Sequence, residues 1–472
     1  MVLPNILLIF TDQQRFDTIH ALGNDKIFTP NFDKLAERGV SFTNAYTNSP
    51  VCVAARQVMH TGLLPHHTGC FDNGDATGRT SFMQVLSARG YQTHGVGKMH
   101  FTHSDRLWGF DSRDESEECG AVDDYKKFID ESGFSHVVEP LGFRSEMYYI
   151  PQVSQVSLET HNSYWVADRS IEYLKSTDRN KPFFLMSSFI KPHPPFETPV
   201  PWNKLYRMVD MDLAKCPEGN DDVTTYWNKF QNRYKYRDKG TDVNLYRTMK
   251  AAYYAAISFV DYNVGRILAY MDSQNLLDNT IILLTADHGE MLGDYDCYGK
   301  RSFLNSAAKI PMILNAPDIS GGMICDELVS LVDVFATFTG NKDTDGASLI
   351  DVANGKVERD HVVGQYSEGN SALYMYATKD YKYIYSAADD KEFLFDADET
   401  INYAGISPYT EIYRKKLIDE YKRSAVPKAL EGIDGDEFKK YPALKVPDDP
   451  DAMLLRQDTQ SSIPNKKDFV RF

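Results

Sequence analysis

Short, uninterrupted runs of apolar residues alternate with helical patterns along most of this chain. The apolar runs predict strands at residues 5–11, 91–98, 182–190, 280–285 and 310–315. Helical spacing of apolar residues predicts helices at 31–38, 81–89, 163–175 and 243–276. Because a strand that is apolar at successive positions is buried on both faces, the alternation predicts an α/β fold. Helices would sandwich a large, mainly parallel (mixed) sheet.

The pattern changes after about residue 345. Short strands separated by turns are predicted at 362–366, 373–377, 381–385 and 392–395. We therefore predict a catalytic α/β domain at 1–345 and a C-terminal subdomain at 346–472. The subdomain would contain a small antiparallel sheet, followed from about Pro442 by an extended tail.

Composition and charge exclude several classes of function. The formal net charge is −16 over 472 residues, so no basic excess exists to bind nucleic acid. No apolar stretch is long enough to cross a bilayer. The apolar run after Pro4 is short and has no positive leader, which predicts a buried strand and not a signal peptide. The six cysteines are scattered without a CxxC pair, which favours a cytoplasmic location over a disulfide-bonded secreted one.

Two of the predicted strands lead into a carboxylate. Asp12 follows NILLIFT, and Asp287 follows TIILLTA with His288 beside it. Because ligands of open α/β sheets collect at the carboxyl ends of strands, these side chains could hold a divalent cation. Oxygen ligands suit Ca²⁺ or Mg²⁺, and the imidazole shifts the preference somewhat toward Mn²⁺. Taken singly, either aspartate also fits a helix cap or a turn.

Cys52 lies where a loop enters a predicted helix, in SPVCVAARQVMH. A thiol near a helix N-terminus is expected to have a lowered pKa. A lone cysteine is otherwise most simply interpreted as a small, buried apolar residue. Arg56 lies four residues further on, one helical turn away, and can face the same ligand as residue 52. The Cys-x-Ala-x-Arg spacing therefore favours a functional cysteine.

Several motifs, all in the same order, resemble the sulfatase family of the alkaline-phosphatase superfamily. CVAAR at 52–56 matches the Cys-x-Pro/Ala-x-Arg signature, which maturation enzymes read to convert the cysteine to formylglycine. Residues 5–12 and 29–46 match the family's opening strand and first helix. The downstream matches are GKMH at 97–100, KPHPPF at 191–196, DHGE at 287–290, Lys300, and the terminal-sheet segments 376–386 and 392–402.

The resemblance implies an alkaline-phosphatase/sulfatase-like fold and covalent hydrolysis of a sulfate ester. Formylglycine at position 52, once hydrated, would attack sulfur through one hydroxyl and release the alcohol. Its second hydroxyl would then allow sulfate to be eliminated and the aldehyde to be regenerated. A divalent cation, Ca²⁺ by preference with Mg²⁺ or Mn²⁺ as alternatives, would assist. Its ligands would be Asp12, Asp287, His288 and Gln13, the last standing where many members have a second aspartate.

The resemblance also implies roles for the other matched residues. Arg56 would hold the formylglycine oxygen, and Lys98 and Lys300 would bind sulfate oxygens. His100 would act as the base in the elimination step, and His193 as the acid that protonates the leaving alcohol. A substrate-binding role for Asn73 is a further expectation. Without the resemblance, each of these lysines and histidines is more simply interpreted as an ordinary polar residue of a loop.

Two competing interpretations stay open on the sequence. A phosphonate monoester or phosphodiester hydrolase shares the metal pattern seen here as Asp12-Gln13 and Asp287-His288. The pair Lys98 and His100 favours sulfate, because the compared phosphonate enzymes have uncharged residues at both places. A non-catalytic binding protein would be favoured if Cys52, Arg56 or a metal ligand were missing, and none is.

Substrate and partners are expected from weaker signals. Parts of GKMHF and DHGEMLGD look like choline sulfatases, but the acidic insert 105–125 lacks the paired tryptophans expected for a quaternary ammonium. A small sulfated saccharide is therefore favoured over choline sulfate or an aryl sulfate. We expect the insert to form part of the pocket rim. The expected partner is a formylglycine-generating or anaerobic sulfatase-maturing enzyme, with no nucleic acid and no membrane. A second copy of the chain is a further candidate partner.

Overall fold

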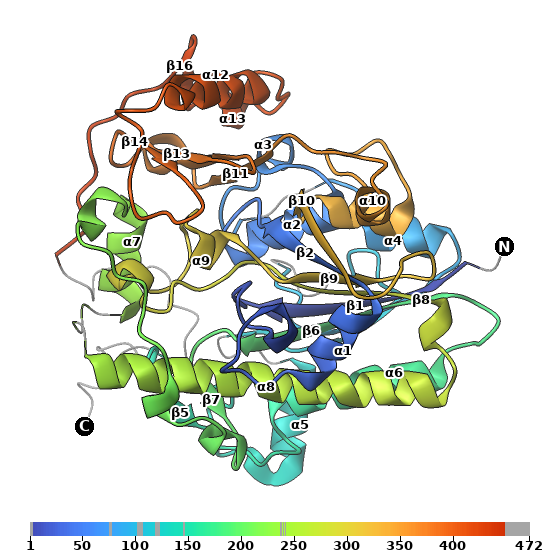
Figure 1. Ribbon diagram of the computed structural model, residues 1–472. Coiled ribbons are helices and arrows are strands. Elements are labelled where there is room, and N and C mark those ends of the chain that lie inside the picture. The colour runs from blue at the N-terminus through green and yellow to red at the C-terminus, as the bar shows by residue number, and fades with distance from the viewer. Residues whose placement is uncertain are drawn as a thin grey trace, which may run out of the picture.

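The fold is seen in a computed structural model of the chain (Figure 1). It describes residues 3–74, 78–101, 107–118, 123–144, 147–236, 238, 240 and 242–448. None of the helices in these ranges combines the length and the apolar character that a bilayer crossing requires. Among the described cysteines, Cys52, Cys216, Cys297 and Cys325 are free.

An eight-stranded sheet forms the centre of the molecule. In spatial order its strands are β10 (Met323–Ser330), β2 (Val40–Tyr46), β9 (Met312–Asn315), β8 (Thr280–Ala286), β1 (Asn5–Asp12), β6 (Phe183–Pro192), β3 (Gln92–Gly97) and β4 (Ser112–Glu115). Within this sheet β9 runs antiparallel to β2 and β8, and the other neighbours pair in parallel. The predicted mainly parallel, mixed sheet is confirmed.

Hydrophobic cores lie on both faces of the sheet, as the continuous apolar strands require. Along β1, Ile6, Leu8 and Phe10 join one core, while Leu7 and Ile9 join the other. The helices α1 (Pro30–Arg38), α6 (Asn162–Ser176) and α8 (Val243–Ser273) cover the second face. The helices α2 (Cys52–Thr61), α4 (Phe82–Ala88) and α10 (Asp333–Thr339) lie on the first (Figure 1).

The second predicted sheet is also present. It contains β11 (Val362–Tyr366), β12 (Leu373–Ala377), β13 (Lys382–Ser386) and β14 (Lys391–Phe395), all antiparallel to their neighbours. Helix α12 (Tyr409–Tyr421) packs on it (Figure 1). Residues 442–448 form no helix or strand, and Leu444 N–H donates to Ala388 O at 2.8 Å.

The remaining elements are short. They are α3 (Pro65–Thr68), α5 (Asp124–Ile129), α7 (Tyr226–Gln231), α9 (Asn305–Ala308), α11 (Leu349–Ala353), α13 (Pro427–Leu430), β5 (Gln152–Val153), β7 (Glu197–Thr198), β15 (Ile433–Asp434) and β16 (Glu437–Phe438). Sequence patterns predicted none of these elements, and they also missed β2, β4, β10, α10 and α12. In β10 the adjacent acids Asp326 and Glu327 interrupt the apolar residues, and this hides the strand from a search for continuous apolar runs.

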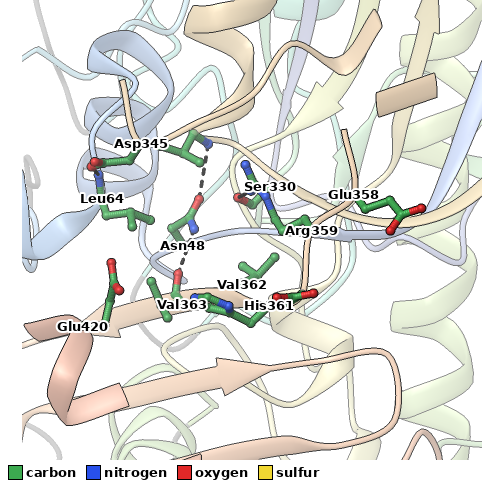
Figure 2. Close-up of a pocket in the computed structure, with 12 residues that line it drawn as sticks. Asn48, Leu64, Ser330, Asp345, Glu358, Arg359, His361, Val362, Val363 and Glu420 are labelled. Carbon is green, nitrogen blue, oxygen red and sulfur yellow. Dashed lines mark hydrogen bonds between the residues drawn. The ribbon is translucent and has the colours of Figure 1, made fainter. Parts of the chain in front are cut away.

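A cavity of about 270 Å³ lies where the small sheet meets the larger body (Figure 2). Its lining includes the acidic side chains of Asp345, Glu358, Asp360 and Glu420. Asn48 closes one wall by donating to Val363 O at 2.8 Å, which ties the loop before α2 to the first strand of the small sheet. None of the sequence-predicted site residues lines this cavity.

Candidate active site

The ends of β1 and β8 bring two aspartates together. The parallel register pairs Thr11 with Ala286, so the next residues, Asp12 and Asp287, leave the sheet side by side. Both carboxylates are fully buried. Burial and the charge of Asp12 raise the pKa of Asp287 to about 6. A buried acid pair of this kind requires cations beside it.

His288 and Cys52 complete a cluster at this end of the sheet. The side chains of Asp12, Asp287, His288 and Cys52 offer ligand atoms that all lie within 4.8 Å of one another. His288 Nδ1 lies 3.0 Å from Gly289 O, so in the neutral ring it carries the proton and Nε2 faces the Cys52 thiol at 3.3 Å. The cluster predicted from the two strand ends therefore exists, with the cysteine as a further member.

Cys52 is the first residue of α2, as the sequence predicted. Its Sγ lies 2.8 Å from Lys300 Nζ, 3.8 Å from Asp12 Oδ1 and 3.9 Å from Lys98 Nζ. Burial and Asp12 oppose ionisation of the thiol. Lys300, Lys98 and His288 outweigh them and hold the pKa of Cys52 well below its ordinary value. The site thus stabilises negative charge at position 52.

Arg56 lies one turn further along α2 and links the two aspartates. Its Nη2 lies 3.3 Å from Asp12 Oδ2 and 3.4 Å from Asp287 Oδ2. Its Nη1 donates to Lys98 O at 2.8 Å and to Ser188 Oγ at 3.1 Å. The predicted contact was with residue 52, whereas the hydrogen bonds of Arg56 go to these neighbours. Arg56 thus neutralises the buried carboxylates and fixes the loop that carries Lys98.

The amide of Gln13 is oriented by its neighbours. Its Oε1 accepts from Lys300 Nζ at 3.0 Å, on the side that faces Cys52. Its Nε2 donates to Glu290, whose carboxylate also accepts from Tyr149 Oη at 2.9 Å. Gln13 has a φ of +66°, a conformation that Tyr253 supports by donating to Gln13 O at 2.7 Å. The oxygen of the amide, which is the end able to bind a cation, therefore points into the site.

Glu118 is a functional neighbour that sequence reasoning did not single out. Its carboxylate contacts Lys98 Nζ and Arg144 and lies 3.6 Å from His193 Nε2. His193 Nδ1 lies 2.6 Å from Pro194 O, which leaves Nε2 to face the site. Burial lowers the pKa of His193 well below its ordinary value, so the ring is neutral at pH 7. The sequence did contain a signal for Glu118, because it belongs to the acidic insert 105–125 between the motifs GKMH and KPHPPF.

The other two predicted residues lie beside the cluster without a direct contact to Cys52. The half-buried His100 adopts a φ of +54°, and its backbone N–H donates to Glu117 Oε1 at 2.5 Å. Asn73 is exposed, and its Oδ1 accepts from Val53 N at 3.3 Å. Asn73 thus caps the first turn of α2, which carries the cysteine.

The insert at 105–125 contributes an acid to the site and packs its aromatic rings inside. The Glu118 carboxylate contacts Lys98 and Arg144, and the role of the insert as a pocket rim stays a prediction. Phe110 and Tyr125 are buried, and Trp108 packs against Phe101 with ring centroids 5.3 Å apart. These rings do not form an open cage for a quaternary ammonium. Residues 105–106 and 119–122 lie outside the described residues.

At the carboxyl edge of a sheet that is covered on both faces, a thiol at a helix start thus lies beside two lysines and a buried acid pair. The family model for sulfatases matches residues 4–340. This chain belongs to the sulfatase family, so the resemblance seen in its motifs is confirmed.

Known proteins of this family are similar over nearly the whole chain. An arylsulfatase of Clostridium perfringens is 28% identical, covering 93% of this chain and 98% of the relative. A choline-sulfatase of Rhizobium meliloti is 27% identical, covering 84% and 80%. Among solved structures, a phosphonate monoester hydrolase of Agrobacterium radiobacter superposes with a TM-score of 0.77 at 22% identity, covering 90% of this chain and 97% of the other. The predicted alkaline-phosphatase-like fold is confirmed.

Proposed function

We propose that this chain hydrolyses sulfate esters, with a formylglycine made from Cys52 as nucleophile and a divalent cation, Ca²⁺ by preference. The observation that carries the proposal is the position of the Cys52 thiol. It lies at the start of α2 between Lys300, Lys98 and the cluster of buried ligand atoms. A maturation enzyme that reads the CVAAR segment is the implied partner. The substrate that we favour is a small sulfated saccharide.

The residues at the site fit a cation. Asp12 and Asp287 provide buried carboxylates, Gln13 turns its amide oxygen inward, and His288 provides Nε2. This oxygen-rich set suits Ca²⁺, and one imidazole keeps Mn²⁺ and Mg²⁺ as alternatives. In the matured protein the oxygens of hydrated formylglycine would take the place of the Cys52 sulfur. When bound, the cation would lower the pKa of the nucleophile and polarise the sulfate.

The side chains around position 52 divide the remaining work. Lys98 and Lys300 would bind the sulfate oxygens, on which negative charge accumulates in the transition state. His193 would protonate the leaving oxygen through Nε2. Because the ring is neutral in the free site, this role requires the charge of bound sulfate to raise its pKa. His100 would serve as the base of the elimination step after a small movement toward residue 52.

Hydrolysis of phosphonate monoesters is the second candidate function, supported by the pair Asp12-Gln13. The test is turnover of an aryl sulfate beside an aryl phosphonate monoester with the same leaving group. We expect kcat/KM for the sulfate to be higher by roughly 10-fold or more, because Lys98 and His100 add positive charge and a base. A preference for the phosphonate would show that the substrate class is wrong and that the metal pattern outweighs these two residues.

Swapping the amide of Gln13 and the carboxylate of Glu290 tests whether Glu290 positions Gln13, a proposed ligand of the cation. In Gln13→Glu a carboxylate faces the Glu290 carboxylate, so we expect Ca²⁺ affinity to fall by roughly 10- to 100-fold despite the added charge. The double variant Gln13→Glu/Glu290→Gln restores a hydrogen bond and should recover that affinity. The measurement is the shift of thermal unfolding on titration with Ca²⁺.

The variant Tyr149→Phe is the graded control for this exchange. It removes one partner of Glu290 and leaves the Gln13 contact in place, so its effect on Ca²⁺ affinity should be smaller. Tighter binding by Gln13→Glu alone would contradict the positioning role of Glu290, because charge would then be the dominant factor.

A further inference from the structure

The guanidinium of Arg301, the residue that follows Lys300, is buried without an acidic ion-pair partner among the described residues. Arg301 is 5% exposed, and its Nε and Nη1 atoms are buried without a hydrogen-bond partner among the described residues. No described carboxylate lies within ion-pair distance of it. A buried charge of this kind is costly and calls for a partner that is not part of the chain.

Other buried arginines of this protein do have carboxylate partners. Arg15 pairs with Asp17 at 2.7 Å and with Asp294 at 2.8 Å. Arg56 pairs with Asp12 and Asp287. Arg301 differs because no described carboxylate forms an ion pair with it, although the Asp72 carboxylate lies close enough to act on its charge. Burial lowers its pKa, but Tyr366, Asp72, Tyr234 and Cys52 together raise it, so the side chain stays charged.

The backbone fixes Arg301 against the loop that carries the nucleophile. Its φ is +64°, a conformation that non-glycine residues rarely adopt and that is often retained at functional sites. Its N–H donates to Pro50 O at 3.0 Å, two residues before Cys52. The preceding residue, Lys300, places its Nζ 2.8 Å from Cys52 Sγ. The positions of the two cations are therefore linked to residue 52.

Aromatic rings surround the Arg301 head. Its guanidinium carbon lies 5.7 Å from the ring centroids of Trp227 and Tyr366 and 6.0 Å from that of Phe230. Trp227 is itself fixed, because its Nε1 donates to Ser371 O at 2.7 Å. Cation–π contacts hold the head in place but supply no counter-charge of their own. The Arg301 guanidinium is therefore held in a fixed position among aromatic rings.

We infer that Arg301 binds a second anionic group on the leaving-alcohol side of the substrate, a carboxylate or a second sulfate. The inference rests on the proposed sulfatase function and narrows its substrate class to sulfate esters that carry another anion. Lys98 and Lys300 are the cations within reach of residue 52 and suffice for the sulfate that is cleaved. The planar guanidinium matches the geometry of either oxyanion. A trimethylammonium group would be repelled, which disfavours choline sulfate.

Matched pairs of substrates test the inference with the full chain. The first pair is N-acetylglucosamine 6-sulfate and glucosamine N,6-disulfate, and the second is glucose 2-sulfate and glucuronate 2-sulfate. We expect the wild-type protein to prefer the dianionic member of at least one pair, and that pair identifies the second anion. In Arg301→Gln, kcat/KM for the preferred dianion should fall roughly 100-fold, while the monoanions and 4-nitrophenyl sulfate change by less than about 3-fold.

The possible results separate this inference from the proposed function. Equal losses on all substrates in Arg301→Gln would overturn the inference, and so would a wild-type preference for the monoanion in both pairs. If the wild-type protein cleaves no sulfate ester, the proposed function itself fails. Arg301→Met adds a measurement without substrate. Its melting temperature should be unchanged or higher, because an unpaired buried charge is removed. A drop of several degrees would show that Arg301 is structural.

Discussion

Replacing Cys52 by alanine should abolish turnover of sulfate esters and leave the fold intact. We expect a loss of kcat on the order of 10⁴-fold or more, as for removal of the nucleophile in other covalent enzymes. Alanine is small enough for the buried start of α2, and Lys300, Lys98 and Arg56 keep their other partners. The loss should therefore appear in kcat on an aryl sulfate, with an unchanged far-UV circular dichroism spectrum.

Cys325→Ala is the matched control for this variant. Cys325 lies half-buried on β10, at the edge of the sheet, and contacts none of the site residues. It should keep wild-type turnover, so that the loss is assigned to position 52 and not to removal of a thiol in general. Substantial turnover by Cys52→Ala would end the formylglycine proposal.

Removing divalent cations should be the second large effect. Dialysis against a chelator should lower turnover of an aryl sulfate by a factor on the order of 10³ or more, because the positive charge that lowers the pKa of the nucleophile and polarises the sulfate would be lost. Added Ca²⁺ should restore turnover, and Mn²⁺ or Mg²⁺ should do so less effectively. The same additions should raise the melting temperature, since a ligand that binds the folded state stabilises it.

The variant Asp287→Asn provides the control for the chelation experiment. It removes a proposed ligand, so added Ca²⁺ should no longer raise the melting temperature at concentrations that saturate the wild-type protein. Full activity in the presence of a chelator would contradict the cation proposal. An unchanged Ca²⁺ response in Asp287→Asn would place the cation elsewhere.

Local patterns were sufficient to predict the elements that build the site. The runs at 5–11 and 280–285 are apolar throughout because β1 and β8 are covered on both faces. Each leads into a carboxylate, and adjacent parallel strands bring Asp12 and Asp287 together. The position of Cys52 at a helix start also followed from the local sequence. The strands and the helix start depend on residues that are neighbours in the chain. The meeting of the two aspartates follows from the rule that the carboxyl ends of parallel strands lie at one edge of the sheet.

What the sequence did not predict depends on contacts between distant segments. The strand order cannot be read from any one strand, and β10 is half-exposed and lacks an apolar run. Glu118 and Arg301 were missed because their significance lies in their neighbours. Glu118 contacts Lys98 and lies near His193, and Arg301 has no carboxylate within ion-pair distance in the part of the chain that the structure describes. A residue type alone does not reveal whether its charge is paired.

The most direct test of the account is the relation between aldehyde content at position 52 and turnover. Preparations made with different amounts of maturation enzyme would be digested, and the fraction of the Cys52 peptide that carries an aldehyde in place of the thiol would be measured by mass. The account predicts that kcat on an aryl sulfate rises in proportion to this fraction and extrapolates to zero for the unmodified thiol. Turnover that is independent of the fraction would contradict it.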